Sequence, residues 1–300
     1  MELRSVLGIF TSVFAISTTF LNSLIIMAIL GRRRAYYRSH FFYIIYMVGA
    51  IIDVITLINS HTLALFPSRG LFLDFFLAST TPGRVFLFFA WSSRTCQGFT
   101  NFYIALNRAT AVVAPFSHKK IWSLSYIRAM CFLVQFGISI PVGVYAATGE
   151  VYWVQAASGS WYIQFFDIPS TQRFARFLFV LMCCFSPLTI AAYAVLLRNF
   201  RAHTTKSTGG SGLSDGDTEA KNEQPLVNLA ICVCTLEIFY FFMYCYGFVM
   251  NANFELPLET VYVSYFVVTD LYSGVPTYLL LYFSTSIRQD VSRLICPLLN

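Results

Sequence analysis

Five ionisable side chains lie within otherwise apolar stretches of the sequence: Asp53, Arg94, Arg108, Glu237 and Asp270. If these stretches cross a bilayer, an unpaired charge is costly there, so each residue is a candidate for function. The rise along a helix puts the three carboxylates near the middle of their stretches, and Arg94 roughly 7–8 Å from the middle of its own. Such groups could bind a ligand, or pass ions or protons along the three carboxylates.

Arg94 and Arg108 belong to a polar stripe at helical spacing. Arg94, Gln97, Asn101, Ala105 and Arg108 follow one another in steps of three or four residues, so they share one face of a helix. This face should point into a helix bundle and away from lipid. For Gln97 and Asn101, polar contacts between helices are an alternative to ligand binding. The predicted ligand-binding residues are Arg94, Gln97, Asn101, Glu237 and Asp270.

The composition predicts that helices spanning a membrane position these residues. Hydrophobic residues make up 57% of the chain and charged residues 11%, whereas a soluble domain carries about 25% charged residues. We predict an all-α membrane protein in the lipid bilayer, a single seven-helix domain over residues 1–300. The seven apolar stretches are Val6–Leu30, Phe41–Leu65, Val85–Val113, Ile127–Ala147, Phe174–Leu197, Leu226–Met250 and Glu259–Phe283.

The distribution of Lys and Arg predicts the orientation. The loops on one side of the seven stretches carry twelve of these residues and the loops on the other side carry four. Because the richer side is cytosolic, we expect the N-terminus outside and the C-terminus in the cytosol. The net charge of +6 is thus explained by orientation, and no nucleic-acid partner is expected. The twelve are Arg32, Arg33, Arg34, Arg38, Lys119, Lys120, Arg198, Arg201, Lys206, Lys221, Arg288 and Arg293; the four are Arg4, Arg69, Arg84 and Arg173.

Other chemistry finds little support in the sequence. None of the four histidines lies deep in a predicted span or pairs with carboxylates at the spacing of metal ligands. No arrangement of residues provides a catalytic nucleophile. We therefore expect neither an enzyme nor a bound metal or cofactor.

Three connecting segments have distinct patterns. Residues 198–224 are rich in Gly, Ser, Thr and charge, and are predicted to form a flexible third cytosolic loop. Between residues 148 and 173, two aromatic runs flank Ala-Ser-Gly-Ser, which predicts a hairpin that is either a lid over a pocket or an aromatic belt. The tail, residues 284–300, has the pattern of an amphipathic helix, with Cys296 placed for palmitoylation or left as a buried thiol.

Two strings of residues resemble a known family. Asn107-Arg108-Ala109, followed after five residues by Pro115, resembles the Asp-Arg-Tyr-x5-Pro pattern of rhodopsin-like G-protein-coupled receptors. Asn22 and Asp53 lie where that class carries a polar network. The longer strings LNRATAVVAPFSHKKIW (Leu106–Trp122) and YFSTSIRQDV (Tyr282–Val291) resemble the nematode serpentine chemoreceptors of class gamma, with class V as second choice.

The sequence also departs from the rhodopsin-like pattern. The predicted outside loops contain no cysteine, and the sixth span has only Pro225 at its start. The seventh span has Val275-Pro276-Thr277-Tyr278 where that class carries Asn-Pro-x-x-Tyr. The opening motion of that class is therefore not carried over.

The resemblance implies a chemosensory receptor in the cell membrane, by analogy that of a sensory neuron. A small molecule would bind outside, and a heterotrimeric G protein would be activated inside through Arg108, Pro115, Lys119 and Lys120. The anionic membrane leaflet is an alternative partner for the basic residues. Because the third and seventh spans face one another in this class, Arg94 is expected to pair with Asp270 in preference to Glu237. The alternative function is an ion or proton carrier that uses Asp53, Glu237 and Asp270.

Overall fold

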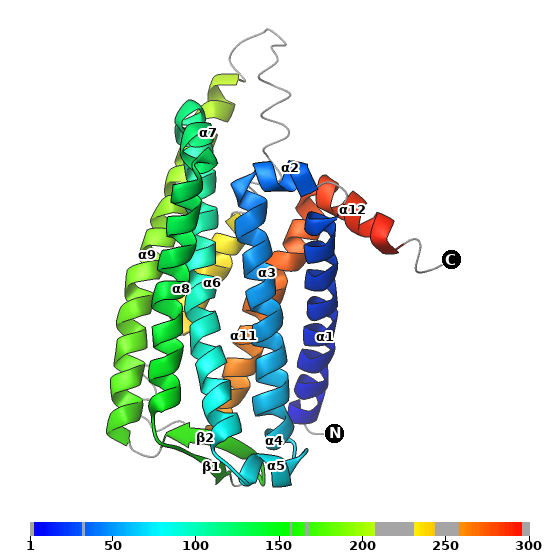
Figure 1. Ribbon diagram of the computed structural model, residues 1–300, viewed down its shortest axis with the longest axis vertical. Coiled ribbons are helices and arrows are strands. Elements are labelled where there is room, and N and C mark those ends of the chain that lie inside the picture. Colours follow the sequence, from blue (N-terminus) through cyan, green and yellow to red (C-terminus); the bar gives the residue numbers. More distant parts are fainter. Residues whose placement is uncertain are drawn as a thin grey trace.

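The protein is a bundle of long helices that run side by side along its longest axis (Figure 1). The computed structural model describes residues 3–31, 34–156, 158–165, 168–207, 231–243 and 258–295. Each predicted apolar stretch contains a helix. These are α1 (Leu3–Leu30), α3 (Phe41–Ser60), α6 (Thr81–Val113), α8 (Ser125–Thr148), α9 (Ile168–Ser207), the segment Ile231–Met243 and α11 (Leu258–Phe283). Only this part of the sixth stretch, Leu226–Met250, lies within the described residues.

Shorter elements join the long helices. Helix α3 continues through a π-helical segment, η1 (His61–Leu65), into α4 (Phe66–Ser68). At one end of the bundle are α5 (Leu73–Leu77) and the strands β1 (Val151–Gln155) and β2 (Trp161–Phe165). At the other end are α2 (Arg34–Ser39), α7 (Pro115–Ser123) and α12 (Thr285–Ile295) (Figure 1). We call these the hairpin end and the α7 end.

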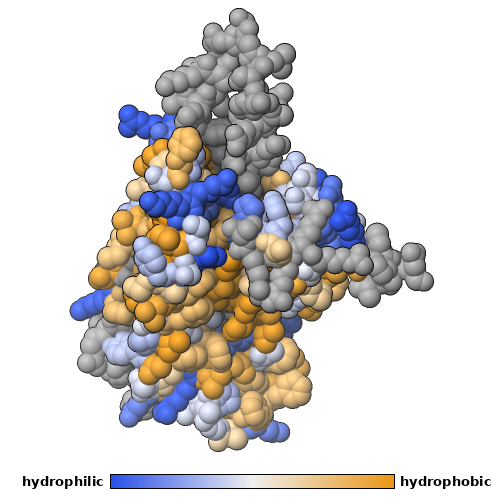
Figure 2. Space-filling model, turned by 45° about the horizontal axis from the view of Figure 1, so that its top comes forward, coloured by the Kyte–Doolittle hydropathy of each residue, from blue (hydrophilic) through white to orange (hydrophobic). Residues whose placement is uncertain are grey.

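The outside of the bundle is suited to lipid. Within the described part of the chain, four segments are long and apolar enough to cross a membrane: Gly8–Leu30, Phe41–Ser68, Ser125–Thr148 and Tyr262–Phe283. Helix α6 is not among them, since it carries the polar stripe. Apolar side chains cover much of the visible flank, and hydrophilic ones gather around the α7 end (Figure 2). Lipid tails are as apolar as these side chains, so a bundle surface of this kind is compatible with a bilayer.

Helix α6 is the centre of the bundle and packs against α3, α8 and α9. Small residues allow its closest approaches. A Cβ atom on Gly143 of α8 would lie 2.7 Å from the carbonyl oxygen of Phe88 and 2.8 Å from Cβ of Ser92, both on α6. The absence of a side chain at Gly143 therefore sets how closely α8 approaches α6, as is common between membrane helices.

We expect Gly143→Ala to destabilise the protein by about 1–3 kcal/mol, because the added methyl group meets backbone that cannot rotate away. The measurement is the melting temperature of the purified protein in detergent. Gly137 is the matched control: it lies in the same helix, and a Cβ there would meet nothing within 4 Å. If Gly137→Ala and Gly143→Ala lowered the melting temperature equally, close packing of α6 and α8 would not be the cause.

The predicted hairpin is confirmed. Strands β1 and β2 pair antiparallel, with Trp153 opposite Ile163. The Tyr262 hydroxyl on α11 donates a hydrogen bond to the Ile163 carbonyl oxygen at 2.5 Å, and Trp153 Nε1 donates to the carbonyl of Ser79 at 3.3 Å. Ile163 is buried. The hairpin thus packs onto the ends of α6 and α11, as a lid would.

The α7 end differs in part from the sequence expectation. Helix α9 continues to Ser207, so residues 198–207 are helical and do not form a loop; residues 208–224 lie outside the described part of the chain. In the tail, α12 buries Ile287 and Val291. The Tyr37 hydroxyl of α2 donates a hydrogen bond to Asp290 at 2.6 Å, which attaches α12 to the bundle. Cys296, the predicted site of palmitoylation, is not among the described residues.

Candidate functional site

The polar stripe of α6 faces the bundle interior. Arg94, Gln97 and Asn101 are all buried, with at most 8% of each residue exposed. They are neighbours because steps of three and four residues return to the same face of a helix. The side chains that meet this face come from α3, α11 and the Ile231–Met243 helix.

Arg94 is held between two aromatic rings. Its guanidinium carbon lies 3.3 Å from the ring centroid of Tyr240 and 3.6 Å from that of Tyr272. Its Nη1 donates a hydrogen bond to Gln97 Oε1 at 3.3 Å. Such stacking stabilises a desolvated cation by about 2 kcal/mol. Neither tyrosine was predicted, because nothing in the sequence distinguishes them from other aromatic residues in apolar stretches.

Gln97 joins the second and seventh spans to α6. Its Nε2 donates to Asp53 Oδ1 at 2.6 Å and to Ser273 Oγ of α11 at 2.9 Å. The charge of Arg94 also acts on Asp53. Asn22, which was predicted to share a polar network with Asp53, instead accepts a hydrogen bond from Thr277 of α11 at 2.7 Å. The two predicted network residues are thus each joined to α11 through a different side chain.

Glu237, on the Ile231–Met243 helix, is also buried. Asn101 Nδ2 donates to Glu237 Oε2 at 3.2 Å, and the Tyr272 hydroxyl donates to the same oxygen. The charge of Arg94 acts on Glu237 as well. A buried carboxylate is tolerated in a protein interior when hydrogen-bond donors and a cation compensate for its lost hydration. Asn101, Tyr272 and Arg94 provide these groups for Glu237.

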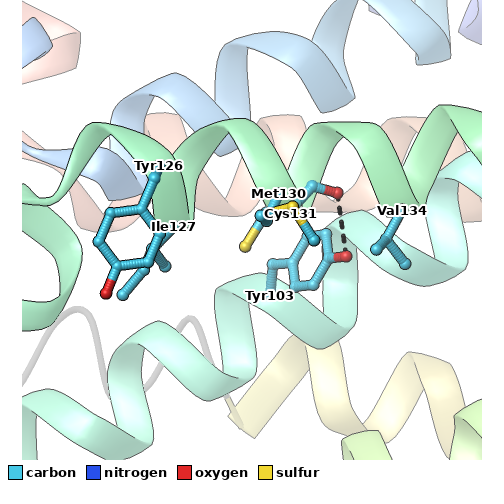
Figure 3. A pocket seen from close by; sticks show the side chains of 6 residues that line it. All are labelled: Tyr103, Tyr126, Ile127, Met130, Cys131 and Val134. Carbon is cyan, nitrogen blue, oxygen red and sulfur yellow. Dashed lines mark hydrogen bonds between the residues drawn. The ribbon is translucent and has the colours of Figure 1, made fainter.

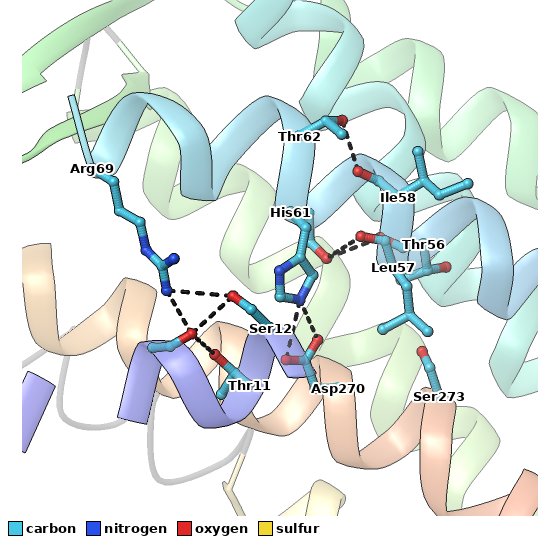
Figure 4. Close-up of polar contacts among 12 residues, drawn as sticks. Thr11, Ser12, Thr56, Leu57, Ile58, His61, Thr62, Arg69, Asp270 and Ser273 are labelled. Carbon is cyan, nitrogen blue, oxygen red and sulfur yellow. Dashed lines mark hydrogen bonds and ion pairs between the residues drawn. The ribbon is translucent and has the colours of Figure 1, made fainter. Parts of the chain in front are cut away.

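Asp270 corrects the predicted pairing. His61 Nε2 lies 3.1 and 3.3 Å from the two carboxylate oxygens of Asp270, and Figure 4 shows the two side chains pointing toward each other. The favoured pairing of Arg94 with Asp270 is therefore wrong. The cause is helix rotation: Asp270 faces the second span, and Arg94 faces Glu237 and Asp53.

His61 is a residue that the sequence analysis missed. It begins the π-helical segment η1, and its side chain is 14% exposed against 3% for Asp270. The expectation for the histidines concerned only the spacing of metal ligands, and the contact of His61 with a single carboxylate is not of that kind. Single turns of π-helix are frequent at functional sites, but periodicity in the sequence does not reveal one. Within the described segments, no group of three His, Cys, Asp or Glu residues could hold a metal ion.

The α7 end carries the predicted coupling residues. The Arg108 guanidinium carbon lies 3.8 Å from the ring centroid of Phe42. Pro115 begins α7, on which Lys119 and Lys120 are exposed. Phe116, which was not predicted, is 94% exposed. The structure therefore places the Arg108 guanidinium, two lysines and an exposed aromatic ring at one end of the bundle.

Helix α7 is fixed to α6 through Thr110. Trp122 Nε1 donates to Thr110 Oγ1 at 2.8 Å, and His118 Nδ1 lies 3.1 Å from the same oxygen. Burial lowers the pKa of His118, and the charges of Arg108 and His40 lower it further. A neutral His118 follows, so α7 adds no third full charge beside Arg108.

In the described part of the chain, seven helical segments surround a charged, hydrogen-bonded interior. The family model of the serpentine type 7TM GPCR chemoreceptor Srv matches residues 10–296, and the chain belongs to this family. The family match and the apolar helices together indicate a multi-pass membrane protein.

A curated relative agrees with this placement. The chain is 25% identical over 192 residues to serpentine receptor class gamma-14 of Caenorhabditis elegans. The match covers 62% of this chain and 57% of that receptor. The resemblance to serpentine receptors is therefore confirmed. The family that matches is class V, the second choice of the sequence analysis, while the relative bears the class gamma name.

Proposed function

We propose that the receptor binds a small molecule through the polar network and activates a heterotrimeric G protein at the α7 end. The observation that carries this proposal is the continuity of α6. This single helix bears Arg94, Gln97 and Asn101 in its middle part and Arg108 closer to the α7 end, about 21 Å from Arg94. A ligand that repositions the Arg94 face can therefore displace Arg108 through a rigid element.

The ligand region consists of the predicted residues Arg94, Gln97, Asn101, Glu237 and Asp270, with His61 added. It lies between the hairpin and the middle of the bundle, since Asp270 is two helical turns from Tyr262, which contacts β2. A ligand must bind one arrangement of these helices better than another to shift the population. Competition for the hydrogen bonds of Glu237 or Asp270 would provide that preference.

The coupling region consists of Arg108, Pro115, Lys119 and Lys120, with Phe116 beside them. The charges attract an acidic partner surface, and the exposed ring of Phe116 supplies apolar area for a contact. Aromatic residues and Arg are the usual energetic centres of protein interfaces.

The test separates this function from its rival, an ion or proton carrier using Asp53, Glu237 and Asp270. The purified protein is reconstituted in liposomes and mixed with candidate G proteins and extracts of potential odorants. We expect accelerated nucleotide exchange and no ion or proton flux above that of empty liposomes. Flux without any partner would support the carrier, for which the three buried carboxylates are the favouring observation.

We propose further that the hairpin end is outside and the α7 end is in the cytosol, in the cell membrane of a sensory neuron. The distribution of Lys and Arg supports this orientation. An epitope tag inserted near Ser158 should be labelled on intact cells, and one near Gly209 only after permeabilisation. Labelling of both tags on intact cells would contradict the seven-span orientation.

A further inference from the structure

A groove lies between α6 and α8 near the α7 end of the bundle. Its volume is about 270 Å³, and it is lined by Tyr103 of α6 with Tyr126, Ile127, Met130, Cys131 and Val134 of α8 (Figure 3). The hydroxyl of Tyr103 is already used, since it donates to the Cys131 carbonyl oxygen at 3.0 Å. The lining therefore offers apolar contacts, and its occupant should be apolar too.

The groove opens toward the bilayer. Tyr126 is 63% exposed and Met130 is 52% exposed, and both lie on a helix that crosses the membrane. From Tyr126 to Val134 the groove runs about 12 Å along the helix. The hydrocarbon of one leaflet is about 15 Å thick, half of the bilayer core. These dimensions fit one acyl chain of a lipid in the leaflet at the α7 end.

Basic residues lie near the α7 end of the groove, where α8 begins, although none of them lines it. Arg128 lies one turn before Cys131, and its Nη2 donates to the Ser123 carbonyl at 2.8 Å. Its Nε is buried and has no hydrogen-bond partner among the described residues. Lys119 and Lys120 are exposed on the adjoining α7, and α8 begins at Ser125 with no acidic residue in its first turn. The first N–H groups of a helix and nearby cations together favour an anion.

We propose that this groove is a binding site for an anionic phospholipid. The acyl chain lies along α8 against Met130 and Val134, and the headgroup phosphate meets Arg128 and the start of α8. The positive charge favours an anionic headgroup, and the apolar groove favours an acyl chain. Binding of the lipid therefore requires both features. The site does not depend on which partner the receptor activates.

The test is native mass spectrometry of the purified receptor with phosphatidylserine and phosphatidylcholine carrying identical chains. We expect phosphatidylserine to be retained preferentially, and Arg128→Gln to lower its retention about fivefold, as expected for one cation near a membrane surface. Val134→Trp should fill the groove and lower the retention of both lipids. Glycerophosphoserine, which has the headgroup but no chains, should not displace the bound lipid.

Arg84→Gln is the matched control, because Arg84 is exposed at the hairpin end, away from the groove. Equal losses in Arg84→Gln and Arg128→Gln would mean attraction by overall charge and would overturn the site. Undiminished retention in Val134→Trp would overturn it as well. Equal retention of the two lipids by the wild-type receptor would show an apolar contact without headgroup recognition, contrary to the proposal. Since Arg128 is only partly buried at the start of α8, its substitution should not prevent folding.

Discussion

Arg94→Leu is expected to lower strongly the amount of folded receptor at the cell surface. The substitution leaves the carboxylates of Glu237 and Asp53 without the cation that acts on them, and it ends the stacking on Tyr240 and Tyr272. Breaking a buried charge cluster by removing one partner costs about 3–5 kcal/mol. A loss of that size is a large fraction of the total stability of an ordinary protein. Surface labelling of cells and the melting temperature in detergent measure the effect.

A second substitution should restore part of the loss. In Arg94→Leu/Glu237→Gln, the buried carboxylate becomes an amide that can still bond Asn101 and Tyr272. We therefore expect the double variant to melt at a higher temperature than Arg94→Leu alone. Arg84→Leu serves as the control for removing an arginine from α6, since Arg84 is exposed. If Glu237→Gln lowered stability further in the Arg94→Leu background, Arg94 and Glu237 would not share a charge cluster.

The same approach tests the pairing of Asp270. Effects of Arg94→Ala and Asp270→Ala on stability should add, because Asp270 bonds His61 instead. Effects of His61→Ala and Asp270→Ala should deviate from the sum by about 0.5–3 kcal/mol, as expected for residues in contact. If the stability effects of His61→Ala and Asp270→Ala simply added, the contact between these two side chains would not contribute to stability.

The sequence could predict the helices because each depends on its own residues. Hydropathy over about 20 residues defined the spans, and α6 was oriented correctly because a stripe of Arg94, Gln97 and Asn101 has only one polar face. The hairpin followed from two aromatic runs around Ala-Ser-Gly-Ser. Each of these features is local, so one sequence suffices.

The contacts between helices could not be predicted in the same way. Whether Arg94 meets Asp270 or Glu237 depends on the rotation of α11 and of the Ile231–Met243 helix, and nothing within either stretch fixes that rotation. His61 was overlooked because it lies near the end of the second span, where a π-helical turn directs it toward Asp270. Tyr240 and Tyr272 are important only because Arg94 is placed between their rings. Similarly, the charge in residues 198–207 predicts a side of the membrane but does not reveal that α9 continues to Ser207.

Arg108→Ala is expected to slow G-protein activation by at least about tenfold while leaving the receptor folded. Arg108 is near the end of α6 and is only partly buried. Water can therefore reach the site, and the stacking on Phe42 is one of the contacts that are lost. A G protein would lose a cation at the centre of the proposed contact. Removing one charged partner of an interfacial pair costs about 2 kcal/mol or more, so ligand-dependent nucleotide exchange should slow by at least about tenfold.

The measurement is nucleotide exchange by reconstituted receptor, normalised to the amount that labels at the cell surface. Arg108→Lys should recover only part of the activity, because an ammonium lacks the planar guanidinium that stacks and donates in a fixed fork. Arg293→Ala is the control: Arg293 is at the same end of the bundle, its side chain is 65% exposed, and it forms an ion pair with Asp290 at 3.3 Å. Since the Arg293 side of that pair is exposed and Asp290 keeps its hydrogen bond from Tyr37, the loss of Arg293 should change little. Full exchange activity in Arg108→Ala would remove Arg108 from the coupling mechanism, and equal losses in both variants would indicate overall charge as the cause.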